Sequence, residues 1–400
     1  MTSKELMQIE DRYGAHNYHP LDVVLSKGEG IWVYDLEGNK FLDFLSAYSS
    51  VNQGHCHPRI VKAMTEQAGK LTITSRAFRN DQLGLFCKQA CELADMEMML
   101  PMNSGAEAVE TAIKAMRKWA YKVKGVEKDK AEIITCAGNF HGRTTTIVGF
   151  STEELYKEYF GPYTPGFKTV PYGDASAVEE AITANTAAVL IEPIQAEGGV
   201  LIPPAGYVKQ VSDICQKHNV LLALDEIQTG LGRTGKMFAC RHDGVQPDVF
   251  ILGKAISGGF YPVSAVVSKK DVLGLFTPGE HGSTFAGNPL ACAVAREALN
   301  VLVDERLPER AAELGVYFMD KLRTIQSGHV QEVRGKGLLI GVELKKSAGG
   351  ARRFCEALQD KGLLCKETHE TVIRLAPPLV ITKEEIDWAF DRIKNVLETL

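Results

Sequence analysis

Four short apolar runs constrain the fold of this chain most strongly, because each is continuous rather than alternating. They are EIITC (132–136), AAVLIEP (187–193), VLLALDE (220–226) and VFILG (249–253). A strand that is apolar on both faces is typical of a parallel sheet covered by helices on both sides. Between the runs lie segments with helical spacing, such as PAGYVKQVSDICQKHN. The sequence therefore predicts an α/β domain.

The pattern changes near residue 330, where a second and smaller unit begins. VQEVRGKGLLIGVEL (330–344) and VIRLAPPLVI (372–381) have the composition of strands, whereas ARRFCEALQDKG (351–362) has a helical pattern. The last segment, TKEEIDWAFDRIKNVLETL, opens with a capping box of Thr382 and Glu385. These features predict a smaller α+β unit that ends in a helix.

Composition excludes several classes of protein. The chain has 400 residues, of which 45% are hydrophobic, so its large core is expected to be divided between domains. The formal net charge of −5 is mixed along the chain, and we expect no nucleic-acid partner. No apolar run approaches the ~20 residues of a membrane span, and the acidic N-terminus has no leader pattern. Nine cysteines without CxxC spacing indicate reduced thiols, so we expect a cytoplasmic protein without a membrane partner.

Polar residues follow the predicted strands at the edge where parallel sheets bind ligands. Lys254 comes directly after VFILG, Asp225 lies at the end of VLLALDE, and Glu192 follows AAVLI. Phe140, His141 and Arg143 follow EIITC within a few residues. An amine, acids, an aromatic ring and a guanidinium are therefore expected at one edge of the sheet.

A lysine in a partly desolvated pocket can act as a nucleophile toward an aldehyde. Pyridoxal phosphate supplies an aldehyde, and it requires a Schiff-base lysine, an acid at the pyridinium nitrogen, a flat surface for the ring and a phosphate cradle. The chain offers Lys254, Asp225 and Phe140 for the first three, and the helix start Ser104-Gly105-Ala106 for the phosphate, with Ser283 and Thr284 as further hydroxyls. Glycines beside Lys254 are expected to let the cofactor lie against the backbone.

Each of these features also has a purely structural interpretation. Lys254 alone could be a surface residue, Phe140 could belong to the core, and NSG could be an ordinary helix cap. GLGRTG (230–235) matches a dinucleotide-binding pattern and keeps a dehydrogenase as an alternative, although no crossover helix follows it directly. We interpret it as a glycine-rich active-site loop. We interpret QGHCHP (53–58) as a turn and predict no metal.

Motifs along nearly the whole chain resemble those of the class III aminotransferases, which are fold-type-I pyridoxal-phosphate enzymes. The matching motifs, in the order of the family, include SAYSSVNQGHCHP, MNSGAEAVE, GNFHGRT, EPIQAEGG, DEIQTGLGRTG, GKAISGG, GEHGSTFAGNP and VRGKGLL. The resemblance implies a large cofactor-binding domain (49–293) with a mostly parallel seven-stranded sheet between helices. It also implies a small C-terminal α+β domain (294–400) and an N-terminal segment (1–48) packed on the small domain and on a dimer partner.

The resemblance also implies roles for individual residues. Lys254 would be the Schiff-base lysine, Asp225 the pyridinium partner and Phe140 the ring platform. Ser104, Gly105, Ala106, His141, Glu192, Gln228 and Ser283 would complete the cofactor site. Thr284 resembles a threonine that reaches the phosphate of the other subunit, so a homodimer with shared sites is implied.

The closest resemblance within the family is to members that act on ornithine. Arg143, helped by Tyr18, would bind the α-carboxylate of ornithine, so that the distal amine reaches the cofactor. Arg374 would bind 2-oxoglutarate in the second half of a ping-pong reaction, and Glu197 would neutralise Arg374 until then. Tyr18 and Tyr48 favour ornithine over N-acetylornithine and 4-aminobutyrate, which remain alternative substrates. A pyridoxal-phosphate aminomutase is a more distant alternative.

Overall fold

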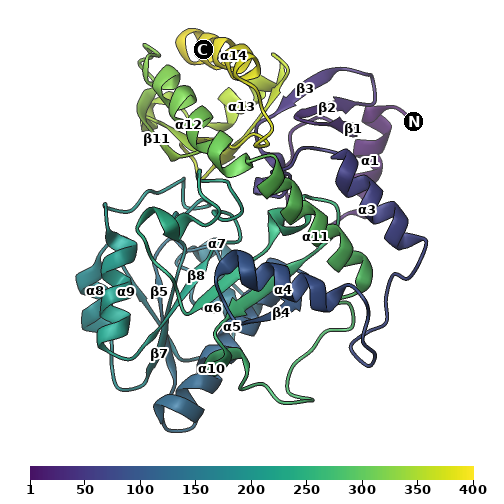
Figure 1. Ribbon diagram of the computed structural model, residues 1–400. Helices are drawn as coiled ribbons and strands as arrows, with labels where there is room; N and C mark the ends of the chain where they lie inside the picture. The colour runs from purple at the N-terminus through teal and green to yellow at the C-terminus, as the bar shows by residue number, and fades with distance from the viewer.

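The computed structural model describes residues 1–400 and is built around a seven-stranded sheet (Figure 1). Its strand order is β4-β10-β9-β8-β7-β5-β6. The strands are β4 (Met98–Met102), β5 (Glu132–Cys136), β6 (Phe167–Val170), β7 (Thr186–Ile191), β8 (Leu221–Asp225), β9 (Val249–Leu252) and β10 (Ser264–Ser268). Strand β10 runs antiparallel to both β4 and β9, and all other neighbouring pairs of this sheet are parallel. The predicted α/β class with a mostly parallel seven-stranded sheet is therefore confirmed.

The continuous apolar runs became strands because helices cover both of their faces. Every residue of β7, β8 and β9 is buried. The predicted run at 187–193 ended two residues too late, since Pro193 lacks an N–H group for the ladder and β7 stops at Ile191. Strands β4, β6 and β10 are not among the strands predicted from the sequence. Strand β4 contains Pro101, and a proline lowers the strand signal.

Helices flank the sheet, and four of them, α5, α6, α8 and α11, begin at a side-chain cap. The flanking helices are α3 (Pro58–Ala68), α4 (Leu83–Ala94), α5 (Gly105–Trp119), α6 (Thr145–Gly149), α7 (Glu154–Lys157), α8 (Ala175–Ala181), α9 (Tyr207–Lys217), α10 (Lys270–Leu273) and α11 (Pro289–Asp304). Helix α5 lies against β9 and β10 and begins at a capping box of Ser104 and Glu107. It thereby directs its first N–H groups toward the carboxyl edge of the sheet.

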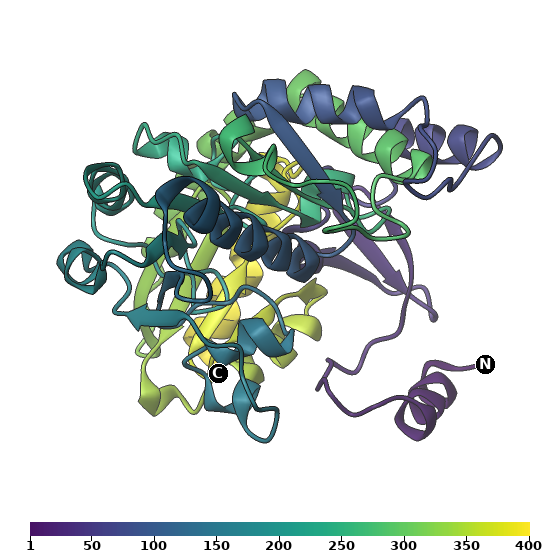
Figure 2. The ribbon, with the colours of Figure 1, turned by 90° about the horizontal axis from the view of Figure 1, so that it is seen from below.

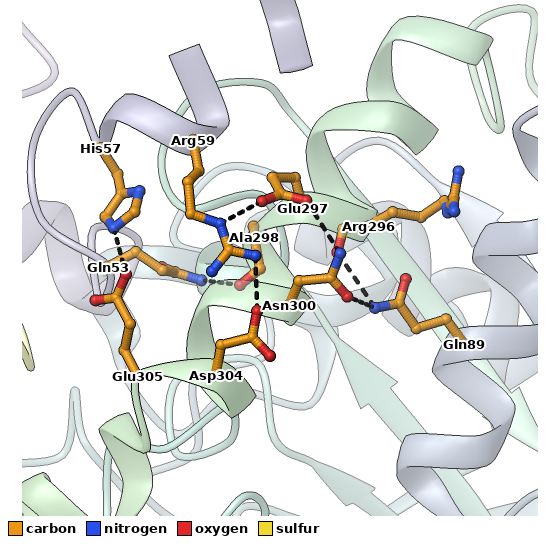
Figure 3. Close-up of polar contacts among 10 residues, drawn as sticks. All are labelled: Gln53, His57, Arg59, Gln89, Arg296, Glu297, Ala298, Asn300, Asp304 and Glu305. Carbon is orange, nitrogen blue, oxygen red and sulfur yellow. Dashed lines mark hydrogen bonds and ion pairs between the residues drawn. The ribbon is translucent and has the colours of Figure 1, made fainter. Parts of the chain in front are cut away.

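Helix α11 holds α3 and α4 through a set of polar contacts (Figure 3). Arg59 on α3 donates to Glu297 at 2.6 Å and to Asp304 at 2.7 Å. Gln89 on α4 donates to the side chain of Asn300 at 2.7 Å. His57, from the HCH motif, pairs with Glu305 at 2.9 Å. This motif therefore contributes to packing between helices.

The C-terminal part forms the second, smaller unit that the sequence predicts. Its sheet has the order β11-β12-β15-β14, from β11 (Val330–Lys336), β12 (Leu339–Leu344), β14 (Lys366–Thr368) and β15 (Val372–Leu375). Helices α12 (Leu307–Arg323), α13 (Arg352–Gln359) and α14 (Lys383–Thr399) pack around it. Helix α14 begins at the predicted capping box of Thr382 and Glu385.

The N-terminal residues join this smaller unit through a third sheet. It combines β1 (Leu25–Glu29), β2 (Trp32–Asp35), β3 (Lys40–Asp43) and β13 (Leu363–Leu364), with β13 parallel to β3. Helix α1 (Ser3–Tyr13) protrudes from the chain and buries no residue (Figure 2), and Ser3 at its start donates to the Glu37 carboxylate at 2.7 Å. The predicted boundaries at residues 48 and 293 remain predictions.

The GLGRTG segment has a different role from the one expected, because none of residues 230–235 lines the cavity described below. Arg233 is fully buried and donates to the carbonyls of Leu338 and Pro377 and to the side chain of Asn52. The segment therefore fastens the large sheet to the smaller unit. The residues that precede the segment do reach the cavity: Asp225, Ile227, Gln228 and Thr229.

Candidate active site

A cavity opens at the carboxyl ends of β5, β7, β8 and β9. Its lining includes eight of the predicted site residues: Gly105, Ala106, Phe140, His141, Glu192, Asp225, Gln228 and Lys254. Three further lining residues were not predicted: Gly142, Ile227 and Thr229. Four separate strands and one helix start thus bring their polar ends together, as expected for an open α/β sheet.

Lys254 lies immediately beyond β9 in a strained backbone conformation. Its φ of 46° is in the left-handed region, which is uncommon for a residue other than glycine and marks functional positions more often than others. Burial lowers the pKa of the Lys254 ammonium, although the Glu197 carboxylate nearby acts in the opposite direction. A lowered pKa increases the fraction of neutral amine that can act as a nucleophile or base.

Asp225 at the end of β8 is held by two neighbours. His141 Nδ1 lies 2.7 Å from its Oδ2, and the N–H of Ile227 donates to its Oδ1 at 3.0 Å. Burial opposes protonation of His141, but the hydrogen bond and charge of Asp225 outweigh burial and raise the pKa of the imidazole. The carboxylate is therefore fixed in direction beside the cavity.

Glu192 lies beyond β7 and is almost completely buried. Its Oε2 accepts the backbone N–H of Phe140 at 3.0 Å. Burial raises the pKa of Glu192 to about 8, partly offset by His141. Burial therefore favours the protonated form of Glu192, which anchors the segment that bears Phe140 and His141.

The start of α5 forms an anion-binding surface at the cavity. The first helical hydrogen bond runs from Ala108 N–H to the Ser104 carbonyl, which leaves the N–H groups of Gly105 and Ala106 ahead of it. Gly142 closes the same corner: its φ is 130°, and a Cβ there would lie 2.9 Å from the Cβ of Ala106. A glycine is required for the two segments to approach this closely.

Two glycines shortly after Lys254 are required by the packing of the chain itself. A Cβ on Gly258 would meet Ile60 at 2.8 Å, and one on Gly259 would meet Val51 at 2.9 Å. Both also have positive φ values. These glycines therefore allow neighbouring protein segments to pack closely, and Gly259 also lines a hollow that it shares with Lys254 and Ser104.

Arg143 lies at the rim of the cavity and is exposed. Its guanidinium stacks over the ring of Tyr156 at 3.6 Å and lies 5.4 Å from the centroid of Phe140. Tyr156 belongs to α7, whose four residues are too short for a periodic pattern, so no local signal predicts this contact. The planar stacking sets the direction in which Arg143 can bind a carboxylate.

A second group of residues surrounds the buried Arg374 on β15. Arg374 pairs with Glu197 at 2.6 Å, and Gln228 donates to the same carboxylate oxygen at 3.2 Å. Burial raises the pKa of Glu197, but Arg374 and then Lys254 outweigh it and keep the pKa below its usual value. The guanidinium of Arg374 also lies 4.8 Å from the ring of Tyr48. An ion pair, an amide and a phenol therefore adjoin the cavity of Lys254.

Several predicted residues lie outside this group. The Ser104 hydroxyl accepts from the N–H of Glu107 and is used as a helix cap. Ser283 accepts from the side chain of Asn103, whereas Thr284 is exposed. Tyr18 is 78% exposed and lines a separate, mainly apolar pocket together with Tyr48. Ser104 shares the lining of a neighbouring hollow with Lys254, whereas Ser283, Thr284 and Tyr18 line neither that hollow nor the cavity.

A buried amine, an acid oriented by an imidazole and an anion-binding helix start, gathered around one cavity, define an enzyme site for amine chemistry. The sequence pattern described as aminotransferase class-III matches residues 13–397. The chain therefore belongs to the class III aminotransferases. The nicotinamide-dependent dehydrogenase alternative is thereby set aside.

Individual relatives are similar over almost their whole lengths. The chain is 60% identical over 392 residues to an ornithine aminotransferase of a Geobacillus species, covering 98% of each chain. The ornithine aminotransferase structure from Toxoplasma gondii, described with partial occupancy of PLP, has a TM-score of 0.98 and 47% identity, covering 99% of this chain and 94% of that one. An acetylornithine aminotransferase from Elizabethkingia anophelis has a TM-score of 0.91 and 48% identity, covering 99% of each chain.

Proposed function

We propose that this aminotransferase moves the distal amine of L-ornithine to 2-oxoglutarate, giving glutamate-5-semialdehyde and glutamate. The semialdehyde then cyclises to pyrroline-5-carboxylate. The observation that carries the proposal is the Glu197–Arg374 pair beside the cavity of Lys254, with Arg143 next to Phe140 of the cavity lining. In this proposal Arg143 is free to bind a carboxylate at all times, whereas Arg374 is neutralised by Glu197, which can move away.

We infer that pyridoxal phosphate is the cofactor, since the residues present fit it. His141 Nε2 is buried without a partner, Asp225 is fixed beside it, and the open N–H groups of α5 suit a phosphate. When bound, the cofactor supplies an aldehyde and an electron-accepting ring. Asp225 would face the ring nitrogen, Phe140 the ring face, and Gly105 and Ala106 the phosphate.

The roles of the chain's own groups follow from their positions. The Lys254 amine, with its lowered pKa, would hold the cofactor, and as a free base it would take a proton from the substrate carbon. Asp225 keeps its direction through His141, and Glu192 fixes the backbone of Phe140. Gln228, which donates to Glu197, would also reach the cofactor's phenolic oxygen.

Substrate direction depends on which arginine is available. Arg143, stacked on Tyr156, would bind the α-carboxylate of ornithine, helped by Tyr18, and leave the distal amine at Lys254. The Glu197–Arg374 pair presents no free positive charge to that amine. When 2-oxoglutarate enters, Glu197 would turn away so that Arg374 can bind the α-carboxylate of 2-oxoglutarate, while Arg143 binds the other carboxylate. Tyr48 would then complete the pocket.

We further propose a homodimer with shared sites. The exposed Thr284, the exposed Phe285 and α1, which buries no residue against its own chain, support this proposal. Thr284 and Ser283 would reach the phosphate held by the other subunit.

No helix combines the length and apolar character needed to cross a membrane. We propose a cytoplasmic location.

The test is a single-turnover half-reaction followed by absorbance. The holoenzyme should show an absorption band near the visible edge that ornithine alone removes and 2-oxoglutarate restores. N-acetylornithine, 4-aminobutyrate and lysine are run in parallel, and any pyrroline product is trapped. Faster reaction with N-acetylornithine than with ornithine would replace the proposed substrate. An aminomutase would turn over without the keto acid.

A further inference from the structure

Three residues that are far apart in sequence lie in one row across the small sheet. In the register of β11, β12 and β15, Arg334 lies opposite Gly341, and Gly341 lies opposite Arg374. Directly opposed residues of antiparallel strands project from the same face of a sheet. Two arginines therefore flank a glycine on the face of the small sheet that meets the large domain.

The loop that carries Glu197 lies over that glycine. Gly341 provides the space, because a Cβ there would lie 3.1 Å from the Cβ of Val200 and 3.4 Å from the carbonyl oxygen of Gly199. On one side Arg374 holds the Glu197 carboxylate at 2.6 Å. On the other side Arg334 donates to the carbonyls of Gly199, at 2.7 Å, and Val200, at 3.1 Å.

The loop has an unfavourable backbone conformation that requires such support. Val200 has φ 54°, and a β-branched residue in the left-handed region is strained. Its side chain is fully buried with Leu339 and Ala376 of the small unit. Thr368 on β14 adds a hydrogen bond to the carbonyl of Glu197 at 2.9 Å. The small sheet therefore determines where residues 197–200 lie.

Arg334 is itself fixed at its other end. Its Nη1 pairs with Glu332 at 2.9 Å and also contacts Glu343, and its side chain is only 11% exposed. It has no contact with the cavity, whose lining does not include it. A guanidinium with both carboxylate and carbonyl partners is a rigid clamp that an ammonium group cannot reproduce.

We propose that Arg334 is a positioning residue that holds Glu197 against Arg374, and that it thereby sets the preference of the site between the amine donor and the dicarboxylate acceptor. The inference rests on the proposed function, in which Glu197 neutralises Arg374 during the ornithine half-reaction. If Arg334 is removed, the loop relaxes, Glu197 pairs less often with Arg374, and the free guanidinium favours dicarboxylates.

Two measurements on the holoenzyme test this proposal. In Arg334→Met, the ratio of kcat/KM for the ornithine half-reaction to that for the 2-oxoglutarate half-reaction should fall about tenfold. Calorimetric titration with glutarate, an unreactive dicarboxylate, should give a Kd at least about threefold lower than in the wild type. Thr368→Val is the milder second variant, and it should move both values in the same direction. Arg334→Lys should resemble Arg334→Met.

The Glu197→Gln background separates positioning from a general structural effect. There, Arg334→Met should leave the ratio unchanged, because the group that it positions is already lost. An equal loss in both half-reactions, or a glutarate Kd that is unchanged or higher, would overturn the proposal while the wild type still reacts with ornithine. A wild type that does not react with ornithine would instead refute the proposed function.

Discussion

Replacing Glu192 with glutamine should remove a pH dependence from the stability of the apoprotein. Burial raises the pKa of Glu192 to about 8, whereas glutamate in an unfolded chain has a pKa of about 4.3. Between these values the folded protein retains a proton that the unfolded chain releases. The stability associated with Glu192 is therefore complete below the unfolded pKa and is lost as pH rises toward 8.

The size of the effect follows from the linkage slope of about 1.4 kcal/mol per pH unit for one proton. From pH 5 to pH 7 the wild type should lose about 3 kcal/mol that the variant retains. For a chain of this length, that difference is about 3 °C in Tm. The glutamine carbonyl can still accept the N–H of Phe140, so the fold should not be disturbed.

The assay is thermal unfolding of both apoproteins at pH 5 and pH 7. The Tm of Glu192→Gln minus that of the wild type should be about 3 °C larger at pH 7 than at pH 5. Glu179→Gln is the matched control, because hydrogen bonds from Lys217 and His218 lower the pKa of that exposed carboxylate. Equal Tm differences at both pH values would refute the assignment of a protonated Glu192.

Three further substitutions test other parts of the structure. Asp43→Ala removes the carboxylate oxygen that accepts the N–H groups of Leu45 and Ser46 at 2.8 Å. The left-handed turn that bears Tyr48 then loses its anchor, so KM for ornithine should rise severalfold, whereas Asp43→Asn should keep KM close to the wild-type value. Gly142→Ala should weaken cofactor binding about tenfold or more in an equilibrium titration, since its Cβ would collide with Ala106. Arg233→Met should lower the free energy of unfolding by about 3–5 kcal/mol, measured in urea, because buried acceptors lose their donor.

The large sheet could be predicted because its central strands are buried on both faces. The same logic placed Lys254, Asp225 and Glu192 at one edge, since parallel strands end together. Residues 132–136 and 249–253 were predicted within a residue of β5 and β9. Short edge strands such as β4 carry a weaker signal, because they are exposed along part of their length.

Other features depend on tertiary contacts that no local pattern encodes. Residues 46–49 form a left-handed turn without a glycine, and Asp43, His55 and the carbonyl of Ala376 support it from outside. Sequence propensity argues against such a turn. The packing contacts of Arg233 and Gly258 are likewise not encoded locally, because their partners lie in segments distant in sequence.

The central claim is that the distal amine of ornithine is the one transferred, and isotope labelling tests it most directly. The enzyme is given ornithine labelled with nitrogen-15 at the distal amine together with 2-oxoglutarate, and the glutamate formed is measured by mass spectrometry. A matched reaction uses ornithine labelled at the α-amine. We predict labelled glutamate from the distal label alone. Labelled glutamate from the α-amine would contradict the account of Arg143, Glu197 and Arg374.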